Sequence, residues 1–314
     1  MSALDWISRA RRLIPRSDRR VLLSPPRLVA RFARFALLRA AGRSGRVYAD
    51  DLEARDPELI RLLLDFWRAF GTRYFRARLE GVENVPAHGP VLLVGNHNGA
   101  LLPSDSFFTS LAITDRYGLD RRMYALAHDF LFEDPILRSY AQRLGVLRAN
   151  QDGAHRALAA GHCVLVYPGS DLDAFRTFGQ RSKIVLGGRK GFLKLALRER
   201  APIVPVVSVG THEQLIVLAR GERAARLTHA HRWARSEVLP LVFALPWGIT
   251  SGFVPYLPLP AQTAVAFGAP ILWPELAPES AEDPLVLERC YAEVEARMQA
   301  MLDRLSEGRR FLIG

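Results

Sequence analysis

A histidine and an aspartate lie eight positions apart in one short polar stretch, GNHNGALLPSD at residues 95–105. A neutral imidazole can remove a proton from an alcohol as the alcohol attacks, and such general-base assistance is typically worth about 10²–10⁴-fold in rate. The base needs a partner on its other ring nitrogen, which fixes the tautomer and stabilises the imidazolium. We therefore take His97 and Asp105 as a candidate catalytic pair. The alternative is that Asp105 only caps a helix and His97 hydrogen-bonds locally.

The elements around this pair predict an α/β fold. The run PVLLVGNH at 90–97 is short, apolar and bounded by turn residues, as in a buried strand. Ser104 and Asp105 are good N-cap residues for a helix through about Tyr117. Strands and helices then alternate as far as residue 210, which indicates a mixed, largely parallel sheet flanked by helices. We predict strands at 73–85, 90–97, 122–129, 144–150, 162–169 and 201–210, and helices at 57–72, 104–117, after Pro135, and at 152–160, 188–199 and 284–305.

Two of the predicted strands end in polar, glycine-containing loops. One loop carries His97, and the other is YPGSDLDAFR at 167–176. Ligands of α/β sheets collect at the carboxyl ends of strands. The residues that could do chemistry therefore cluster where this architecture places a site.

Four blocks, in order, resemble the motifs of the glycerolipid acyltransferase superfamily, of the phosphate acyltransferase or lysophospholipid acyltransferase type. That family uses an Asn-His followed by an Asp as its His–Asp dyad. The blocks are the stretch at 95–105, ALAHDFLFEDPILRSYAQRLGVLRAN (125–150), VLVYPGSDLDAFR (164–176) and APIVPVVSVG (201–210), and the resemblance covers roughly residues 73–275. The resemblance places Arg148 at the position of an arginine that contacts the acceptor.

The chain departs from the family pattern at two points. Seven residues separate His97 from Asp105, where the commonest form has four. Gly169 stands where the family usually has a Glu, which with an Arg helps to hold a phosphate-bearing acceptor. Asp171, Asp173 and Arg176 are the candidates to replace that function. The Pro-Gly form also resembles neutral-lipid acyltransferases.

The resemblance implies a membrane-associated O-acyltransferase. It would move a fatty acyl group from acyl-CoA or acyl carrier protein to a hydroxyl of a glycerolipid such as lysophosphatidate or a lysophospholipid, with His97 as general base. Backbone N–H groups near Gly169 or Ser170 would hold the oxyanion. The alternatives are a neutral-lipid acyltransferase, acting on diacylglycerol or an alcohol, and a non-catalytic lipid-binding protein on the same scaffold.

The expected reaction needs no metal and no cofactor, since the acyl donor is a co-substrate. Phosphate groups of the donor or acceptor would be held by basic side chains and loop backbone. The candidate substrate-binding residues are Asn96, Gly99, Arg148, Pro168, Gly169, Ser170, Asp171, Arg176 and Lys190. His128 and Asp129 could suggest a metal site, but no ligands recur at helical spacing.

The charge of the chain predicts its partner surface. The net charge is +11, and residues 1–48 hold twelve arginines against two aspartates. Within this arm LVARFARFALL (28–38) sets Leu28, Phe32 and Phe35 beside a stripe of arginines, as in an interfacial helix. We expect an anionic membrane on its cytoplasmic face as partner, and no nucleic acid, because no base-reading element is present. The alternative is that Phe32 and Phe35 pack on the domain's own core.

An uncharged stretch near the C-terminus also points to lipid. No charged residue lies between Val238 and Pro274, yet the prolines within 239–260 would break a membrane-spanning helix. We predict a loop region there that lines an acyl-binding cavity or dips into the interface, or else a buried connection. The predicted regions are 1–72 (basic, amphipathic and membrane-associating), 73–275 (the acyltransferase domain) and 276–314 (a helix packing on that domain).

Overall fold

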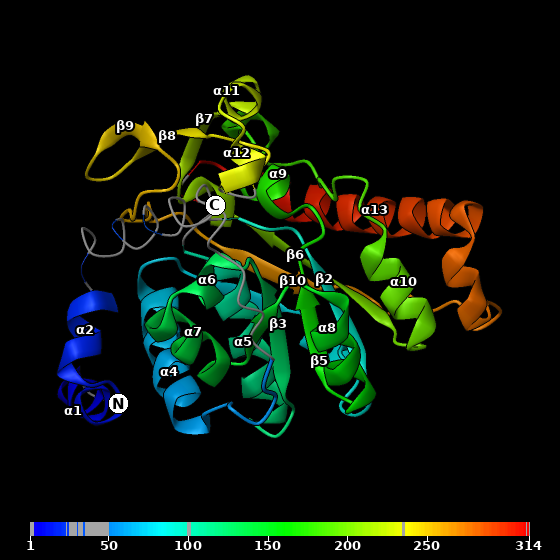
Figure 1. Ribbon diagram of the computed structural model, residues 1–314, viewed down its shortest axis with the longest axis horizontal. Helices are drawn as coiled ribbons and strands as arrows, with labels where there is room; N and C mark the ends of the chain where they lie inside the picture. Colours follow the sequence, from blue (N-terminus) through cyan, green and yellow to red (C-terminus); the bar gives the residue numbers. More distant parts are fainter. Residues whose placement is uncertain are drawn as a thin grey trace.

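A seven-stranded sheet forms the centre of the molecule (Figure 1). The computed structural model describes residues 3–22, 24, 30, 34, 50–98, 102–233, 236–311 and 313. The strand order is β1-β10-β6-β2-β5-β3-β4, with β1 Arg78–Glu80, β2 Val91–Gly95, β3 Met123–Ala127, β4 Val146–Arg148, β5 Cys163–Val166, β6 Ile203–Val209 and β10 Ala264–Phe267. The five strands from β6 to β4 are parallel, and β10 is antiparallel to β6. The predicted fold class is therefore confirmed.

Helices cover both faces of this sheet. Along β2, Val91 and Leu93 pack into one core cluster while Leu92 and Val94 pack into the other, as the two-residue period of a strand requires. The first cluster lies under α4 (Pro57–Arg73) and α5 (Ser104–Tyr117). The second lies under α8 (Gln151–Ala159), α10 (Gly191–Arg198) and α13 (Pro284–Ser306). A strand buried on both faces explains the continuous apolar runs in the sequence.

Three helices begin in the same way, with an Asp-Pro pair. Asp56, Asp134 and Asp283 are N-caps whose carboxylates accept backbone N–H groups of the first turn, in α4, α7 (Pro135–Arg143) and α13. The proline that follows each cap has no N–H to satisfy and has its φ already set for a helix. Each helix boundary is thus encoded locally.

The start of α5 differs from the prediction. Its N-cap is Pro103, and Ser104 and Asp105 lie in the first turn. The Asp105 carboxylate is turned back to the end of β2, where it accepts the N–H of Asn98 at 2.8 Å. The predicted capping role was therefore wrong, because the carboxylate is used across the loop instead.

Some other elements also differ from the prediction. Only Arg78–Glu80 of the range 73–85 pairs as a strand, and a short 3-10 helix, Val82–Asn84, follows it. The sequence also did not predict the short helices α6 Phe130–Glu133, α9 Ser170–Ala174, α11 Glu222–Leu227 and α12 Ala230–Trp233. Helices this short carry too few residues for a periodic signal.

The uncharged stretch 239–260 contains part of a second sheet instead of only a loop. β8 (Leu241–Ala244) and β9 (Gly248–Ser251) form an antiparallel hairpin, and β7 (Ile216–Ala219) pairs with β8. Pro240 and Pro246 lie outside the strands, where a proline removes no ladder hydrogen bond. This small sheet packs on Ala174 and Phe175, at the end of the molecule that also carries α11 and α12 (Figure 1).

The N-terminal arm is described only in part. It forms α1 (Ala3–Leu13) and α2 (Arg16–Leu22), and Leu28, Phe32 and Phe35 lie outside the described residues. The Trp6 indole N–H donates to the carbonyl of Leu62 in α4 at 2.9 Å. No helix among the described residues has both the length and the apolar character needed to cross a bilayer.

Two parts of the chain bear on the predicted regions. Although α4 falls within the range 1–72, its Leu64 and Trp67 belong to the core cluster of the sheet. At the other end, α13 packs Val294 and Met298 against the opposite face. The folded unit built on the sheet thus includes α4 and α13.

Candidate active site

His97 and Asp105 meet at the carboxyl end of β2. The His97 Nδ1 lies 3.1 Å from Asp105 Oδ2, and the side chains are 20% and 2% exposed respectively. The second hydrogen bond to Oδ2, from the Asn98 N–H, holds the carboxylate still. No hydrogen bond engages His97 Nε2 among the described residues. A carboxylate on Nδ1 keeps the proton there and leaves Nε2 as the basic nitrogen, which is the arrangement of a general base.

The ring of His97 lies on the ring of Tyr167, which follows β5. The two rings are stacked, with centroids 4.4 Å apart and an interplanar angle of 23°. Gly95 makes this possible, because a Cβ there would lie 2.5 Å from Tyr167 Cε1. The Tyr167 hydroxyl lies 3.0 Å from Ser106 Oγ. Burial, reinforced by the charge of Asp105, raises the pKa of Tyr167 well above its usual value, so the phenol stays neutral and positions the imidazole by contact.

A buried ion pair anchors the backbone of the histidine. The Asp173 carboxylate accepts the His97 N–H and pairs with the Arg176 guanidinium. Arg176 also donates to Asn98 Oδ1 at 2.8 Å. Asp173 and Arg176 are both fully buried, and burial lowers the pKa of Arg176 to about 9, which leaves it charged near neutral pH. The backbone of His97 is thus held by residues in and just after α9.

Ser208 in β6 and His212 just after it complete the hydrogen-bond network. Asn96 donates to the Ser208 carbonyl at 2.9 Å and accepts the Ser208 N–H at 2.8 Å. The Asn98 amide donates to Ser208 Oγ at 2.8 Å. His212, just past β6, hydrogen-bonds the Arg176 carbonyl through Nε2 at 2.6 Å. Burial lowers the pKa of His212 well below its usual value, so the ring is neutral and donates this hydrogen bond.

Several predicted substrate-binding residues are occupied by bonds within the protein. Asn96 and Arg176 are buried in the network just described. Asp171 accepts from the Ser236 hydroxyl at 2.9 Å and from the Glu237 N–H at 2.6 Å, so it holds the segment before β8. All three side chains are thus engaged in hydrogen bonds within the protein.

The loop before α9 is tightly packed. Pro168 and Gly169 are buried. A Cβ on Gly169 would lie 1.9 Å from the Val185 carbonyl oxygen, so no side chain fits there. The Ser170 N–H already donates to the Tyr167 carbonyl at 3.1 Å, so it is not free to hold an oxyanion. Of the two backbone groups expected near the oxyanion, the N–H of Ser170 is thus already engaged, and the role of Gly169 stays a prediction.

The remaining candidates lie at the periphery. Arg148 ends β4, at the same edge as His97, and its Nε donates to Asp129 at 3.2 Å. Lys190 pairs with Glu288 of α13. Gly99 lies outside the described residues. No group of three or more potential metal ligands occurs within the described part of the chain.

Sequence reasoning missed the structural roles of Asn98 and Ser208, whereas His212 has the structural role that its place after the last predicted strand suggests. Asn98 and Ser208 are 110 positions apart and meet only because β2 and β6 are neighbours. The signal that could have found them is their position: each is a polar residue at or just beyond the carboxyl end of a predicted apolar strand.

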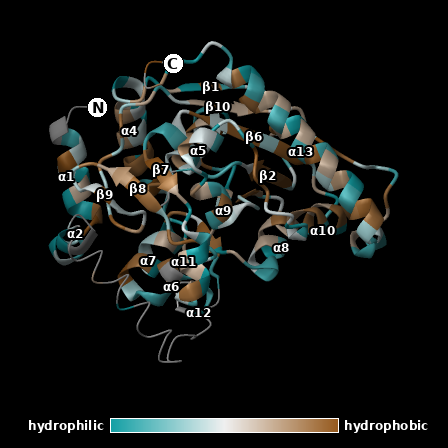
Figure 2. Cartoon of the chain, turned by 90° about the horizontal axis from the view of Figure 1, so that it is seen from above, coloured by the Kyte–Doolittle hydropathy of each residue, from teal (hydrophilic) through white to brown (hydrophobic). Residues whose placement is uncertain are grey.

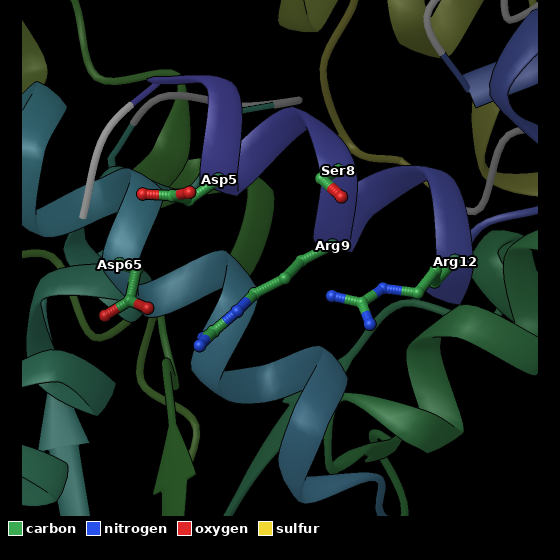
Figure 3. A pocket seen from close by; sticks show the side chains of 5 residues that line it. All are labelled: Asp5, Ser8, Arg9, Arg12 and Asp65. Atoms are coloured by element: carbon green, nitrogen blue, oxygen red, sulfur yellow. The ribbon is translucent and has the colours of Figure 1, made fainter.

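A separate hollow of about 540 Å³ opens between α1 and α4, away from these residues (Figure 3). Asp5, Ser8, Arg9, Arg12 and Asp65 line it, and none of them is a candidate site residue. Its polar lining does not suit an acyl chain.

Comparison with known proteins identifies the family. A family model described as Acyltransferase matches residues 76–209. An uncharacterized protein of Mycobacterium tuberculosis (strain ATCC 25618 / H37Rv) is 34% identical over 287 residues, which cover 90% of this chain and 75% of that protein. The fold resembles the crystal structure of the 1-acyl-sn-glycerophosphate (LPA) acyltransferase PlsC from Thermotoga maritima, with a TM-score of 0.50, 17% identity, and coverage of 93% of this chain and 98% of that one. This chain belongs to the glycerolipid acyltransferase superfamily.

Two further relatives of this acyltransferase carry names that refer to storage lipids and to diacylglycerol. The "DGAT1/2-independent enzyme synthesizing storage lipids" of Gallus gallus is 27% identical over 157 residues, covering 50% of this chain and 46% of that enzyme. Diacylglycerol O-acyltransferase 2 of Mus musculus is 28% identical over 176 residues, covering 52% of this chain and 43% of that enzyme. This chain therefore spans less than half the length of either enzyme.

Proposed function

We propose that this acyltransferase moves a fatty acyl group from a thioester donor, acyl-CoA or acyl carrier protein, to a lipid hydroxyl. The observation that carries the proposal is the His97–Asp105 pair, with Nδ1 on the carboxylate and the ring partly exposed. His97 Nε2 takes the acceptor's proton while the alkoxide oxygen attacks the thioester carbonyl. Asp105 stabilises the imidazolium. The tetrahedral intermediate collapses, the C–S bond breaks, and the imidazolium returns the proton to the departing thiolate.

A non-catalytic lipid-binding role fits this geometry less well. Asp105 is almost fully buried beside His97, and burying a carboxylate is costly unless it is paired. Asp173 and Arg176, a second buried charged pair, serve to hold the same histidine. Several buried charged groups thus fix the position and tautomer of one imidazole, which supports a chemical role for it.

Two observations favour a neutral acceptor, such as diacylglycerol, over lysophosphatidate. The position of the family's phosphate-contacting Glu is Gly169, where the Val185 carbonyl leaves no room for a side chain. The arginine of the same block, Arg176, is buried against Asp173 and Asn98. Neither residue is available to a phosphate. The names of the chicken and mouse relatives support the same choice.

We also propose that the protein works at a membrane, on its cytoplasmic face. A diacylglycerol acceptor resides in the bilayer, and the arginines of residues 1–48 favour an anionic surface. Each basic residue close to such a surface contributes about 1 kcal/mol at low salt. The partners of the protein are then an anionic membrane, a lipid acceptor and an acyl thioester.

Lipid product analysis tests this proposal. Purified protein is incubated with labelled acyl-CoA and, in parallel, with diacylglycerol, lysophosphatidate, glycerol-3-phosphate and lysophospholipids. We expect triacylglycerol as the main product with the wild-type chain and none with His97→Ala, which should fold normally. Phosphatidate as the main product would restore the lysophosphatidate alternative. Normal turnover by His97→Ala would refute the mechanism.

A further inference from the structure

The outer face of the β7-β8-β9 sheet is apolar and exposed. Seven of the fourteen exposed large apolar side chains among the described residues lie on this sheet or on the loops that join it. We call them the sheet-face patch: Leu218, Leu241, Phe243, Leu245, Trp247, Ile249 and Leu257. Figure 2 shows the apolar colour along β7 and β8. Contiguous exposed apolar surface marks an interaction site more often than scattered single residues do.

Side chains along β8 alternate between an inner, packed face and the outer face that carries the patch. Val242 and Ala244 face inward and pack with Phe175, which follows α9. Phe243 faces outward and lies opposite Ile249 in the hairpin register. A sheet that is apolar on both faces needs a partner on both, and only the inner face has one among the described residues.

The charges around the patch select the kind of partner. No charged residue interrupts the chain between Val238 and Pro274. Directly after β7, residues 220–232 carry four arginines against one glutamate, and Arg223 and Arg226 are exposed. These residues lie beside the sheet, since a Cβ on Gly221 would lie 1.9 Å from the Leu239 carbonyl oxygen. An apolar face with a basic border matches the acyl chains and headgroups of an anionic bilayer.

The sheet stands at the edge that holds the dyad. It is inserted between β6 and β10, and β6 runs parallel to β2, so the insertion leaves the sheet at the edge where β2 presents His97. Gln214 ties the insertion to the site, because it accepts from the Ser104 hydroxyl at 2.9 Å and from the Leu259 N–H at 2.9 Å. Ser104 is the neighbour of Asp105 in the first turn of α5.

We propose that the sheet-face patch inserts into the interfacial layer of an anionic phospholipid bilayer and turns the active-site edge towards the lipid. Trp247 suits that depth, since its ring is half exposed while its indole N–H is satisfied by the Pro255 carbonyl at 2.6 Å. The patch is a second contact, on the catalytic domain itself, in addition to the basic arm. The inference rests on the proposed function only for the reason why a bilayer should face the dyad.

The test uses the triple variant Leu241→Thr, Phe243→Thr, Ile249→Thr. These side chains point outward, and threonine keeps a high strand propensity, so the hairpin should persist. The matched control is Leu272→Thr, Leu285→Thr, which removes exposed leucines outside the patch. Full-length proteins are sedimented with vesicles of phosphatidylcholine and phosphatidylglycerol in equal amounts, and circular dichroism and thermal unfolding report folding. We expect the triple variant to bind vesicles at least about tenfold more weakly than wild type and the control to be unchanged.

Trp247 gives an independent readout in the wild-type chain. Bromine-labelled phospholipid should quench the fluorescence of wild-type protein more strongly than that of Trp247→Phe. Equal quenching of the two chains would contradict insertion, whatever the fate of the triple variant.

Activity separates this inference from the proposed function. With a short-chain diacylglycerol dissolved as monomers, the triple variant should match wild type, and with vesicle-borne diacylglycerol it should be slower. If wild type shows no acyl transfer but the triple variant still loses vesicle binding, the inference holds and the proposed function fails. Vesicle binding by the triple variant that equals that of wild type would overturn the inference. The inference would also fail if wild type proved to be a dimer and the triple variant a monomer that still binds vesicles.

Discussion

At the residue scale, one carboxylate oxygen of Asp105 accepts hydrogen bonds from two neighbouring residues. Its Oδ2 accepts from His97 and from the Asn98 N–H, while Oδ1 accepts from the Ser106 N–H at 2.7 Å. The residue therefore fixes the conformation of the loop as well as pairing with the imidazole of His97. A change of charge and a change of shape at this position should have different consequences.

Asp105→Asn keeps the size of the side chain and removes its charge. We expect kcat to fall about 10²–10⁴-fold, because the imidazolium loses its stabilising carboxylate. KM for the acyl donor should change little, since the carboxylate is buried. Thiol release followed against donor concentration measures both constants. Activity within about tenfold of wild type would mean that Asp105 serves the loop alone.

His212 gives the protein a pH-dependent stability. Its pKa in the folded chain is depressed by burial, whereas the unfolded chain protonates near the ordinary value of 6.5. Below that value the unfolded state binds the additional proton, so the free energy of unfolding falls as the pH falls, by at most about 1.4 kcal/mol per pH unit. In His212→Gln, whose amide can donate to the same carbonyl, this part of the pH dependence is absent.

Urea unfolding of both chains between neutral and mildly acidic pH checks this. The stability advantage of wild type over His212→Gln should shrink as the pH falls. Parallel pH profiles would show that His212 is protonated equally in the folded and unfolded chains.

At this scale, what the sequence could predict depends on distance along the chain. His97 and Asp105 are close enough in sequence for their chemistry to suggest a pair, and the geometry brings them together. The contacts of Asn98 with Ser208, and of His212 with Arg176, depend on which strands are neighbours. A single sequence carries no information about that order until the topology is known.

At the element scale, the loop between β5 and α9 is tightly packed against its neighbours. Gly169 packs against Val185, and four residues later Asp173 binds the backbone of His97. A backbone shift at Gly169 should therefore displace His97.

Gly169→Ala should lower both stability and activity. The added methyl meets the Val185 carbonyl oxygen at 1.9 Å and Asp173 Cβ at 2.4 Å, so the loop must move. Overpacking of this kind typically costs about 1–3 kcal/mol. Chemical denaturation measures the loss, and the rate with saturating substrate should fall in a chain that is still folded. A fully stable and fully active Gly169→Ala chain would contradict the packing argument.

Elements with local signals were predicted well, and others were not. The Asp-Pro pairs at 56–57, 134–135 and 283–284 mark helix starts through capping alone. The hairpin at 241–251 was missed because LVFA is apolar at every position, although its side chains point alternately in and out. A strand that is apolar on both faces looks the same in sequence as a buried loop segment.

At the scale of the whole molecule, charge and apolar surface are placed separately. The arginines of residues 1–48 give most of the net charge, while the sheet-face patch lies in a stretch without charge. Electrostatic attraction acts over the Debye length, about 10 Å at 0.1 M salt, whereas apolar insertion acts at contact. The arm should therefore draw the protein to the membrane, and the patch should hold it there.

Salt separates the two contributions. At low salt we expect clear preference for vesicles that contain phosphatidylglycerol over vesicles of phosphatidylcholine alone. At about 1 M salt, where the Debye length is about 3 Å, this preference should disappear while some binding remains. Sedimentation of the wild-type chain at both ionic strengths measures this. Equal binding to both vesicle types at low salt would exclude an electrostatic role for the arm.

The stack of His97 on Tyr167 has a spectroscopic consequence. The imidazole lies over the face of the phenol ring, within the shielding cone of its ring current. The ring protons of His97 should therefore resonate upfield of those of exposed histidines, which makes this one of the eight histidines of the chain recognisable by NMR. Its protonation could then be followed directly, in the resting enzyme and with a bound acyl donor.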